Sequence, residues 1–152
     1  MHIIFARHGE RRKGESDPEL TSWGRRMSTE TGQWLQDQGL RPDLVLVTPT
    51  MRTRQTAEEI LLLFSAPIPT REAGLPTWQM EDWDALMSSL QAELPEDGVA
   101  LLVGHHPTMD MIKSKFGSLP TTVPRGNFAS AVVLHSGASG WQCTAAWPGR
   151  PA

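Results

Sequence analysis

The chain has 152 residues, 39% of them hydrophobic, and a formal net charge of −3 at pH 7. This length fits one domain with its own core, so we expect a single domain over residues 1–152. The negative net charge argues against a general nucleic-acid-binding protein. No apolar run approaches the length of a membrane span, and the first residues lead into a strand rather than a signal peptide. We therefore expect a cytoplasmic protein that contacts no membrane. Cys143 is the only cysteine, so no internal disulfide can form and we interpret it as structural.

The first half of the chain alternates apolar runs with polar segments that have helical spacing. In order, the pattern predicts a strand over residues 2–7, a loop over 9–20, a helix over 22–38, a strand over 43–47, a helix over 51–64 and a short extended piece around Ile68. Thr21 is a suitable N-cap for the first helix, and Gly39 is a suitable end for it.

The second half continues the alternation and then changes character. In order, it predicts a loop over residues 71–80, a helix over 81–94, a strand over 99–103, a helix over about 107–116, and strands over 128–134 and 141–147 joined by a turn over 136–140. We expect the residues after Trp147 to be loose. Three buried aliphatic strands, each followed by a helix, predict an α/β fold. We expect a three-layer α/β/α sandwich with a mostly parallel central sheet and a late antiparallel hairpin at its edge.

Each of the three buried strands is followed directly by polar residues. Arg7-His8-Gly9 follows the first strand, residues 48–57 follow the second, and Gly104-His105-His106-Pro107 follows the third. Parallel strands carry their carboxyl ends to one edge of the sheet, where ligand sites of open α/β sheets form. We therefore expect these three groups to converge in space although they lie far apart in the sequence.

The residue types in these groups suit an oxyanion. Arg7 offers a planar fork of donors, and Gly9 allows the backbone to come close to a ligand. Arg52 lies in the first turn of a helix, where a cation is unfavourable unless an anion is bound nearby. Arg54 is two positions further along, so the two arginines do not share a helix face. We expect only one of them to enter the site and interpret Arg54 as a solvated surface residue.

The histidines of these groups differ in position. His8 could act as a base, a nucleophile or a donor. His105 follows Gly104 at a strand end and is better placed than His106, which we expect to be exposed or to lie at the pocket rim. The histidines lack the spacing of a zinc site, so we expect neither a metal nor a cofactor.

A run of three basic residues, Arg11-Arg12-Lys13, follows the first motif. Such a run is most often a solvated loop. Next to an anion site it could also steer an acidic substrate toward the pocket. The sequence leaves both interpretations open.

With these motifs the chain resembles the histidine phosphatase (phosphoglycerate mutase-like) superfamily. The matching segments, in order, are Arg7-His8-Gly9-Glu10, Leu20-Thr21-Ser22-Trp23-Gly24, Arg52-Thr53-Arg54-Gln55-Thr56-Ala57 and Val103-Gly104-His105-His106-Pro107. The region from Pro124 to Trp147 resembles the end of the short bacterial phosphohistidine phosphatases of the SixA type. The resemblance implies a phosphoglycerate mutase-like fold and a catalytic pocket in which His8 becomes phosphorylated. It implies that the phosphoryl oxygens are held by Arg7, Arg52 and His105. The substrate-binding residues would be Arg7, Gly9, Arg52, His105 and His106.

The resemblance also implies an activity, a phosphatase (hydrolase) that works through a phosphohistidine intermediate. No metal would be required, because the arginines supply the positive charge. We favour phosphohistidine on a protein as the substrate, because a short chain leaves the pocket open and an imidazole leaving group needs little acid help. A broad small-molecule phosphomonoester phosphatase or a mutase is the alternative, and a non-catalytic phosphate-binding regulatory module is an alternative of another class. The partner would be a phosphorylated protein or a small phosphomonoester, and phosphate or sulfate should occupy the site.

The residue that protonates the leaving group is not identified by these motifs. Larger members of the family use a carboxylate to protonate the leaving group. The candidates in this chain are Glu72, Glu81, Asp82 and Asp84, although solvation at the surface is the ordinary role of such residues. His8 must be neutral to attack phosphorus, whereas a protonated His105 would bind the phosphoryl oxygens more strongly. We therefore expect activity to be best near or below neutral pH and to fall as His105 loses its proton.

Overall fold

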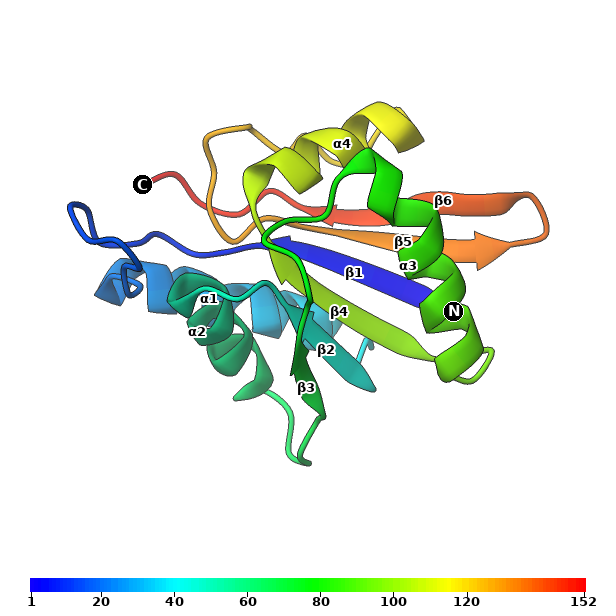
Figure 1. Cartoon of the computed structure of the whole chain (residues 1–152), viewed down its shortest axis with the longest axis horizontal. Coiled ribbons are helices and arrows are strands. Elements are labelled where there is room, and N and C mark those ends of the chain that lie inside the picture. The colour runs from blue at the N-terminus through cyan, green and yellow to red at the C-terminus, as the bar shows by residue number, and fades with distance from the viewer.

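A six-stranded mixed sheet forms the centre of the computed structural model, which describes residues 1–152 (Figure 1). The elements in chain order are β1 (His2–Arg7), α1 (Ser22–Asp37), β2 (Leu44–Val47), α2 (Met51–Leu61), β3 (Thr70–Glu72), α3 (Met80–Glu93), β4 (Val99–Gly104), α4 (His106–Phe116), β5 (Ala131–Gly137) and β6 (Gly140–Trp147). The strand order is β3-β2-β4-β1-β5-β6. The pairs among β1, β2, β3 and β4 are parallel, whereas β5 pairs antiparallel with β1 and β6. The predicted α/β fold with its late hairpin is confirmed.

The alternation of side chains along β1 divides the core into two layers. Ile3 and Phe5 belong to an apolar cluster that includes the buried side chains of α3 and α4. Ile4 and Ala6 point to the other face of the sheet, where Leu35 of α1 and residues of α2 complete a second cluster. Both faces of β1 and β4 are therefore covered, which explains why these strands are continuous apolar runs.

Two of the helices, α1 and α2, begin at threonines whose side chains cap them. The side chain of Thr21 accepts a hydrogen bond from the backbone of Gly24 and confirms the predicted start of α1. The side chain of Thr50 accepts from the backbone of Thr53 at the start of α2. None of the four helices combines the length and the apolar character that a membrane crossing requires.

Three predictions about the elements are wrong. Residues 70–72, expected to lie in or next to a loop, form the edge strand β3, whose three side chains are all exposed and polar and so give no apolar signal. β5 begins at Ala131 rather than at residue 128, and its ladder with β6 extends to the pair Gly137–Gly140, so the turn is shorter than expected. The tail after Trp147 is not loose, because Arg150 and Phe128 exchange backbone hydrogen bonds.

The parallel strands bring their carboxyl ends to one edge of the sheet. β1, β4 and β2 are neighbours, with Arg7 paired to Gly104 and Val47 paired to Val103. The ends of these three strands and the residues after them therefore lie side by side, and they include the four predicted catalytic residues, Arg7, His8, Arg52 and His105.

Candidate active site

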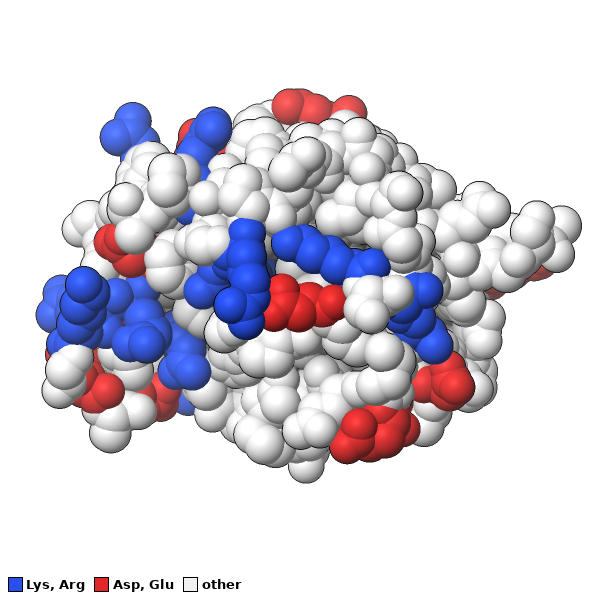
Figure 2. Space-filling view, turned by 90° about the horizontal axis from the view of Figure 1, so that it is seen from above, with Lys and Arg blue, Asp and Glu red and all other residues white.

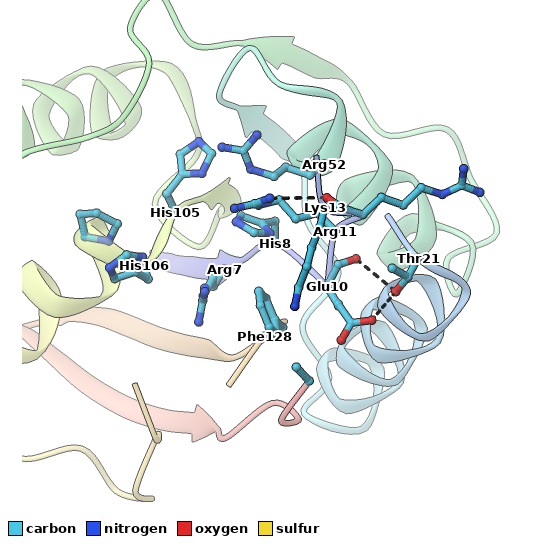
Figure 3. Close-up of a pocket in the computed structure, with 13 residues that line it drawn as sticks. Arg7, His8, Glu10, Arg11, Lys13, Thr21, Arg52, His105, His106 and Phe128 are labelled. Atoms are coloured by element: carbon cyan, nitrogen blue, oxygen red, sulfur yellow. Dashed lines mark hydrogen bonds between the residues drawn. The ribbon is translucent and has the colours of Figure 1, made fainter. Parts of the chain in front are cut away.

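A cavity of about 780 Å³ opens at this edge of the sheet (Figure 3). Arg7, His8, Arg52 and His105 all line it, and His106 lies beside them. The imidazole rings of His8 and His105 are 5.4 Å apart between centroids. The structure therefore brings together the four side chains that the sequence predicted to converge.

The backbone on both sides fixes the position of His8. Its N–H donates to the carbonyl of Gly104 at 3.0 Å, and its own carbonyl accepts from the N–H of Ala129 at 3.0 Å. Nδ1 of the ring lies 2.7 Å from the carbonyl oxygen of Gly9. Because a carbonyl oxygen only accepts, Nδ1 carries the proton. The lone pair of the neutral ring is thus on Nε2.

Burial keeps this ring uncharged. The side chain of His8 is 5% exposed. Desolvation lowers its pKa to about 3, and the positive charges of Arg52 and Arg7 act in the same direction, whereas the hydrogen bond with Gly9 opposes them. At neutral pH His8 is therefore a neutral imidazole with an available lone pair, the state that a nucleophile requires.

The guanidinium group of Arg7 has protein hydrogen-bond partners at Nη1 but none at Nε. Its Nη1 donates to the carbonyl oxygens of Arg125 at 3.1 Å and Asn127 at 2.8 Å, and its guanidinium lies 4.3 Å from the centroid of the Phe128 ring. Its Nε is buried without a hydrogen-bond partner. Buried polar atoms are rarely left unpaired, and an anion in the cavity would supply the missing acceptor.

Arg52 presents the same feature from a different element. It is the second residue of α2, and its Nε is also buried without a partner. Burial lowers the pKa of Arg52, and the positive charge of Arg11 lowers it further. Arg54, by contrast, is exposed and pairs with Glu72 outside the cavity. The expectation that only one of the two arginines enters the site is in accord with this geometry.

His105 is the N-cap residue of α4 and follows the end of β4. Its Nε2 lies 3.0 Å from the hydroxyl of Thr48. Desolvation lowers its pKa to about 4, and the positive charges of Arg52 and His106 contribute. Without a ligand, His105 is therefore neutral at pH 7, which differs from the protonated state we expected. A phosphoryl anion in the cavity would offset the arginine charges and raise the pKa of His105 again.

Gly9 does not have the ligand-binding position that the sequence suggested. It is absent from the cavity lining, and its N–H donates to the hydroxyl of Thr56 at 2.9 Å. A Cβ at this position would lie 2.5 Å from the carbonyl oxygen of Gly24 and 2.8 Å from the hydroxyl of Ser28. The missing side chain thus allows the loop after β1 to pack against α1.

The four acidic residues considered as proton donors lie outside the cavity. Glu72 pairs with Arg54, and Asp82 accepts a hydrogen bond from the backbone of Gln79 at the start of α3. Asp84 faces Lys115, and Glu81 is exposed in the first turn of α3. Glu10 is the one acidic side chain that lines the cavity. None of the four candidates therefore has the position that a proton donor needs.

His106 lies at the cavity, as expected, and accepts a hydrogen bond from Arg125 Nη2 at 3.4 Å. Arg125 in turn donates to Asp110 at 2.9 Å. No group of three or more His, Cys, Asp or Glu side chains is arranged to hold a metal ion. The cationic character of the cavity thus comes from its arginines and lysine.

Comparison with known proteins connects this arrangement to a family. Residues 3–138 match the model of the histidine phosphatase superfamily (branch 1). The chain belongs to this superfamily. The serine/threonine-protein phosphatase Pgam5, mitochondrial, of Drosophila ananassae is 43% identical over 63 residues, or 40% of this chain. The aligned segment spans only 22% of the length of that relative.

Solved structures share the whole fold of this chain. The protein histidine phosphatase SixA, solved with tungstate, has a TM-score of 0.80 at 20% identity over 96% of both chains. A SixA from Agrobacterium tumefaciens has a TM-score of 0.74 at 22% identity, again over 96% of both chains. The similarity extends from the parallel strands to the late hairpin, so the predicted SixA-like architecture is confirmed.

Sequence reasoning missed three residues that shape this histidine phosphatase site. Phe128 lines the cavity and packs on both Arg7 and His8, with its ring centroid 5.9 Å from that of His8. Thr48 contacts His105, and Asn127 supplies a carbonyl to Arg7. Phe128 and Asn127 lie about 120 residues from Arg7 in the sequence, so no local pattern could have identified them. The position of Thr48 directly after a buried strand was the one available signal.

Proposed function

We propose that this chain is a phosphatase that transfers the phosphoryl group of its substrate to Nε2 of His8 and then hydrolyses the phosphoenzyme. We further propose that the substrate is phosphohistidine on a protein. The observation that supports the chemistry is a neutral imidazole with a free Nε2, placed beside two guanidinium groups whose buried Nε atoms have no protein acceptor. Two buried donors without an acceptor suit a tetrahedral oxyanion better than a neutral ligand.

The first step forms the phosphoenzyme. The Nε2 lone pair of His8 attacks phosphorus, and the bond from phosphorus to the leaving group breaks with its electron pair going to that group. Charge spreads over the three equatorial oxygens in a loose transition state. Arg7 and Arg52 are fixed before the reaction begins, and donors placed in advance contribute about 3–4 kcal/mol each to such a transition state.

The second step releases phosphate. A water molecule attacks phosphorus, the bond to Nε2 breaks, and its electron pair returns to His8, which again becomes neutral. Both protons of the water stay on the product, which leaves as dihydrogen phosphate. The hydrogen bond to the Gly9 carbonyl keeps the proton on Nδ1 throughout. His8 therefore needs no rearrangement between turnovers, and its low pKa favours the return to the neutral form.

Two features favour phosphohistidine on a protein as the substrate. The cavity is about 780 Å³, large for a single phosphoryl group and open enough for a side chain of another protein. Its only acidic side chain, Glu10, accepts a hydrogen bond from Thr21 at 2.7 Å. An imidazole leaves phosphorus with less help from an acid than an alkoxide does, so a site without a dedicated acid suits a P–N bond. The protein histidine phosphatase SixA, solved with tungstate, has the same fold.

The charge of the cavity also suggests that no metal ion takes part. Arg7 and Arg52 provide the permanent positive charge that magnesium provides in many other phosphoryl-transfer sites. We therefore expect the rate to be the same after treatment with a strong chelator as before it.

A comparison of two substrates tests the proposal. The protein is incubated with a phosphohistidine-bearing protein or with phenyl phosphate, and released phosphate and acid-labile phosphoenzyme are measured. We expect both substrates to label His8, with the higher kcat/KM for phosphohistidine. Faster turnover of phenyl phosphate and other phosphomonoesters would instead identify a broad phosphatase. Binding of phosphate without phosphoenzyme or turnover would identify a regulatory module and contradict the proposed chemistry.

A further inference from the structure

Three more basic residues line the same cavity and take no part in the chemistry described above. Arg11, Arg12 and Lys13 are exposed and belong to the loop between β1 and α1. Figure 3 shows Arg11 and Lys13 beside His8 and Arg52, and Figure 2 shows Lys and Arg side chains gathered at one end of this face. The cavity thus has a buried phosphoryl-binding end and an exposed basic rim, which consists of Arg11, Arg12 and Lys13.

The basic rim lacks carboxylate partners, whereas six other cations of this protein have them. No Asp or Glu forms a salt bridge with any of its three residues. Cations elsewhere do form such pairs, namely Arg25, Arg54, Arg71, Lys115, Arg125 and Arg150. The acidic Asp17 of the same loop is used otherwise, because its Oδ1 accepts from the backbone N–H of Met51 at 3.0 Å. The charge of the basic rim is therefore available to a ligand.

The loop that carries the basic rim is anchored at its base. Arg11 and Leu20 form an antiparallel bridge, and the N–H of Arg12 donates to the carbonyl of Glu19 at 2.8 Å. The N–H of Leu20 donates to Gln55 Oε1 of α2 at 2.8 Å. These contacts fix the backbone of Arg11 and Arg12 at the mouth of the cavity, with Lys13 next in the chain.

The positive charge of the basic rim reaches the phosphoryl-binding end. Arg11 lowers the pKa of both Arg7 and Arg52 through its charge. Five cations and one acidic side chain, Glu10, line the cavity, and a single phosphoryl group compensates only part of the remaining positive charge. Further negative charge on the same ligand would compensate the rest.

We propose that Arg11, Arg12 and Lys13 bind acidic side chains that flank the phosphohistidine of the substrate protein. This inference rests on the proposed function and specifies its partner, a protein with a carboxylate-rich segment next to the phosphorylated residue. A protein segment fits better than a small dianion, because the basic rim is exposed to solvent. The whole chain has a net charge of −3, so the basic rim is a local positive region that orients an acidic partner toward the cavity.

The test compares two synthetic peptides of equal length with a central phosphohistidine, one with Asp and Glu beside it and one with Asn and Gln. The readout is the ratio of their kcat/KM values, so a general loss of activity does not imitate the effect. We expect a ratio of about ten at low salt, which decreases as salt screens the charges. The triple variant Arg11→Gln, Arg12→Gln, Lys13→Gln should bring the ratio close to one. The control Arg41→Gln, an exposed cation next to the start of β2 at the opposite edge of the sheet, should leave it unchanged.

The outcomes separate this inference from the proposed function. Equal turnover of both peptides by the unmodified protein, or a triple variant that keeps the preference, would overturn the acidic partner alone. Failure on both peptides with turnover of phenyl phosphate would remove the proposed substrate class and this inference with it. The protein could instead prefer O-phosphoserine over phenyl phosphate, lose this preference in the triple variant, and show no preference between the two peptides. This outcome would identify a small anion as the ligand of the basic rim and contradict the proposal.

Discussion

A pair of neighbouring histidines lies at each end of β1, and the two pairs have different surroundings. His8 and His105 lie at the carboxyl end, with ring centroids 5.4 Å apart. His2 and His135 lie at the amino end, with centroids 4.5 Å apart, and line a cavity of about 550 Å³. Proximity of two imidazoles is therefore common to both ends of the strand.

The charges around the two pairs differ in sign. Arg7 and Arg52 share the cavity of His8, whereas Glu96 and Asp97 share the cavity of His2. Burial lowers the pKa of a histidine at both ends. Two carboxylates repel a phosphoryl anion, and two guanidinium groups attract it. The comparison indicates that the arginines, together with the free Nε2 of His8, make one end suitable for phosphoryl transfer.

The largest effect should come from His8→Asn. The variant keeps a polar side chain but lacks the Nε2 lone pair, so the phosphoenzyme cannot form. We expect kcat to fall by about a thousandfold or more, as for loss of other nucleophiles. Acid-quenched protein incubated with labelled substrate should carry no covalent phosphate. Covalent label at the level of the unmodified protein would show that another residue is the nucleophile.

Removal of Arg52 should have the next largest effect. Arg52→Ala deletes one donor fixed in advance, and we expect kcat to fall about a hundredfold to a thousandfold. The matched control is Arg54→Ala, on the same helix but paired with Glu72 outside the cavity. An exposed pair of this kind contributes about 1 kcal/mol or less to stability, and we expect it to leave turnover unchanged. Equal losses in both variants would contradict the assignment of Arg52.

The change of kcat/KM with pH should be smaller than the loss in the Arg52 variant and larger than the effects of the last two substitutions below. The pKa of His8 is about 3 and that of His105 about 4 without ligand, so both rings are neutral from about pH 5 upward. His105 is therefore protonated in the complex only if the substrate binds as its monoanion and transfers its proton to the ring. The second pKa of a phosphomonoester is about 6, so the monoanion becomes scarce above that pH. With phenyl phosphate we expect kcat/KM to be level between about pH 4 and 6 and to fall about tenfold per unit above that.

The acid side of the same profile reports His8. Falling pH protonates Nε2 and removes the nucleophile, so activity should be lost only near pH 3, far below the ordinary histidine pKa of 6.5. A loss centred near pH 6.5 would show that His8 is not desolvated as the structure indicates. A level profile from pH 5 to 9 would contradict the protonated His105.

The sequence predicted the parts of the molecule that depend on local patterns. β1 and β4 are continuous apolar runs. Arg7 and His8 lie at the end of β1 and His105 follows β4, so the sequence pattern was enough to predict that the three residues converge. β3 was missed because three exposed polar residues at a sheet edge carry no apolar signal. The close approach of Gly9 to α1 was missed because the partner, Gly24, lies in another element.

The protonation states could not be read from the sequence at all. They depend on how far His8 and His105 are desolvated and on the cations that the fold places around them. A motif shows that two histidines and two arginines occur, but the lowered pKa of His105 follows only from their packing. The expected protonated His105 therefore had to be replaced by a neutral ring whose pKa depends on the ligand.

A smaller effect should come from Phe128, which lies on the guanidinium of Arg7 with a separation of 4.3 Å. Phe128→Leu keeps an apolar side chain but removes the aromatic face. A cation–π contact of this kind contributes about 1 kcal/mol, so we expect a loss of about fivefold in kcat/KM. If Phe128 positions Arg7, the loss should disappear when the comparison is made in an Arg7→Ala background, because the contact no longer exists there. An undiminished loss in that background would assign Phe128 a different role.

The smallest effect should come from the second histidine pair, and it tests the comparison most directly. His2→Gln and His135→Gln remove both imidazoles at the amino end of β1, where Glu96 and Asp97 stand in place of arginines. We expect kcat/KM and phosphoenzyme formation to change by less than about twofold, since charge differences at the far edge of the sheet are screened over a distance of about 10 Å. A loss comparable with that of Arg52→Ala would mean that the two ends of β1 are coupled, and that the sign of the surrounding charge is not what distinguishes them.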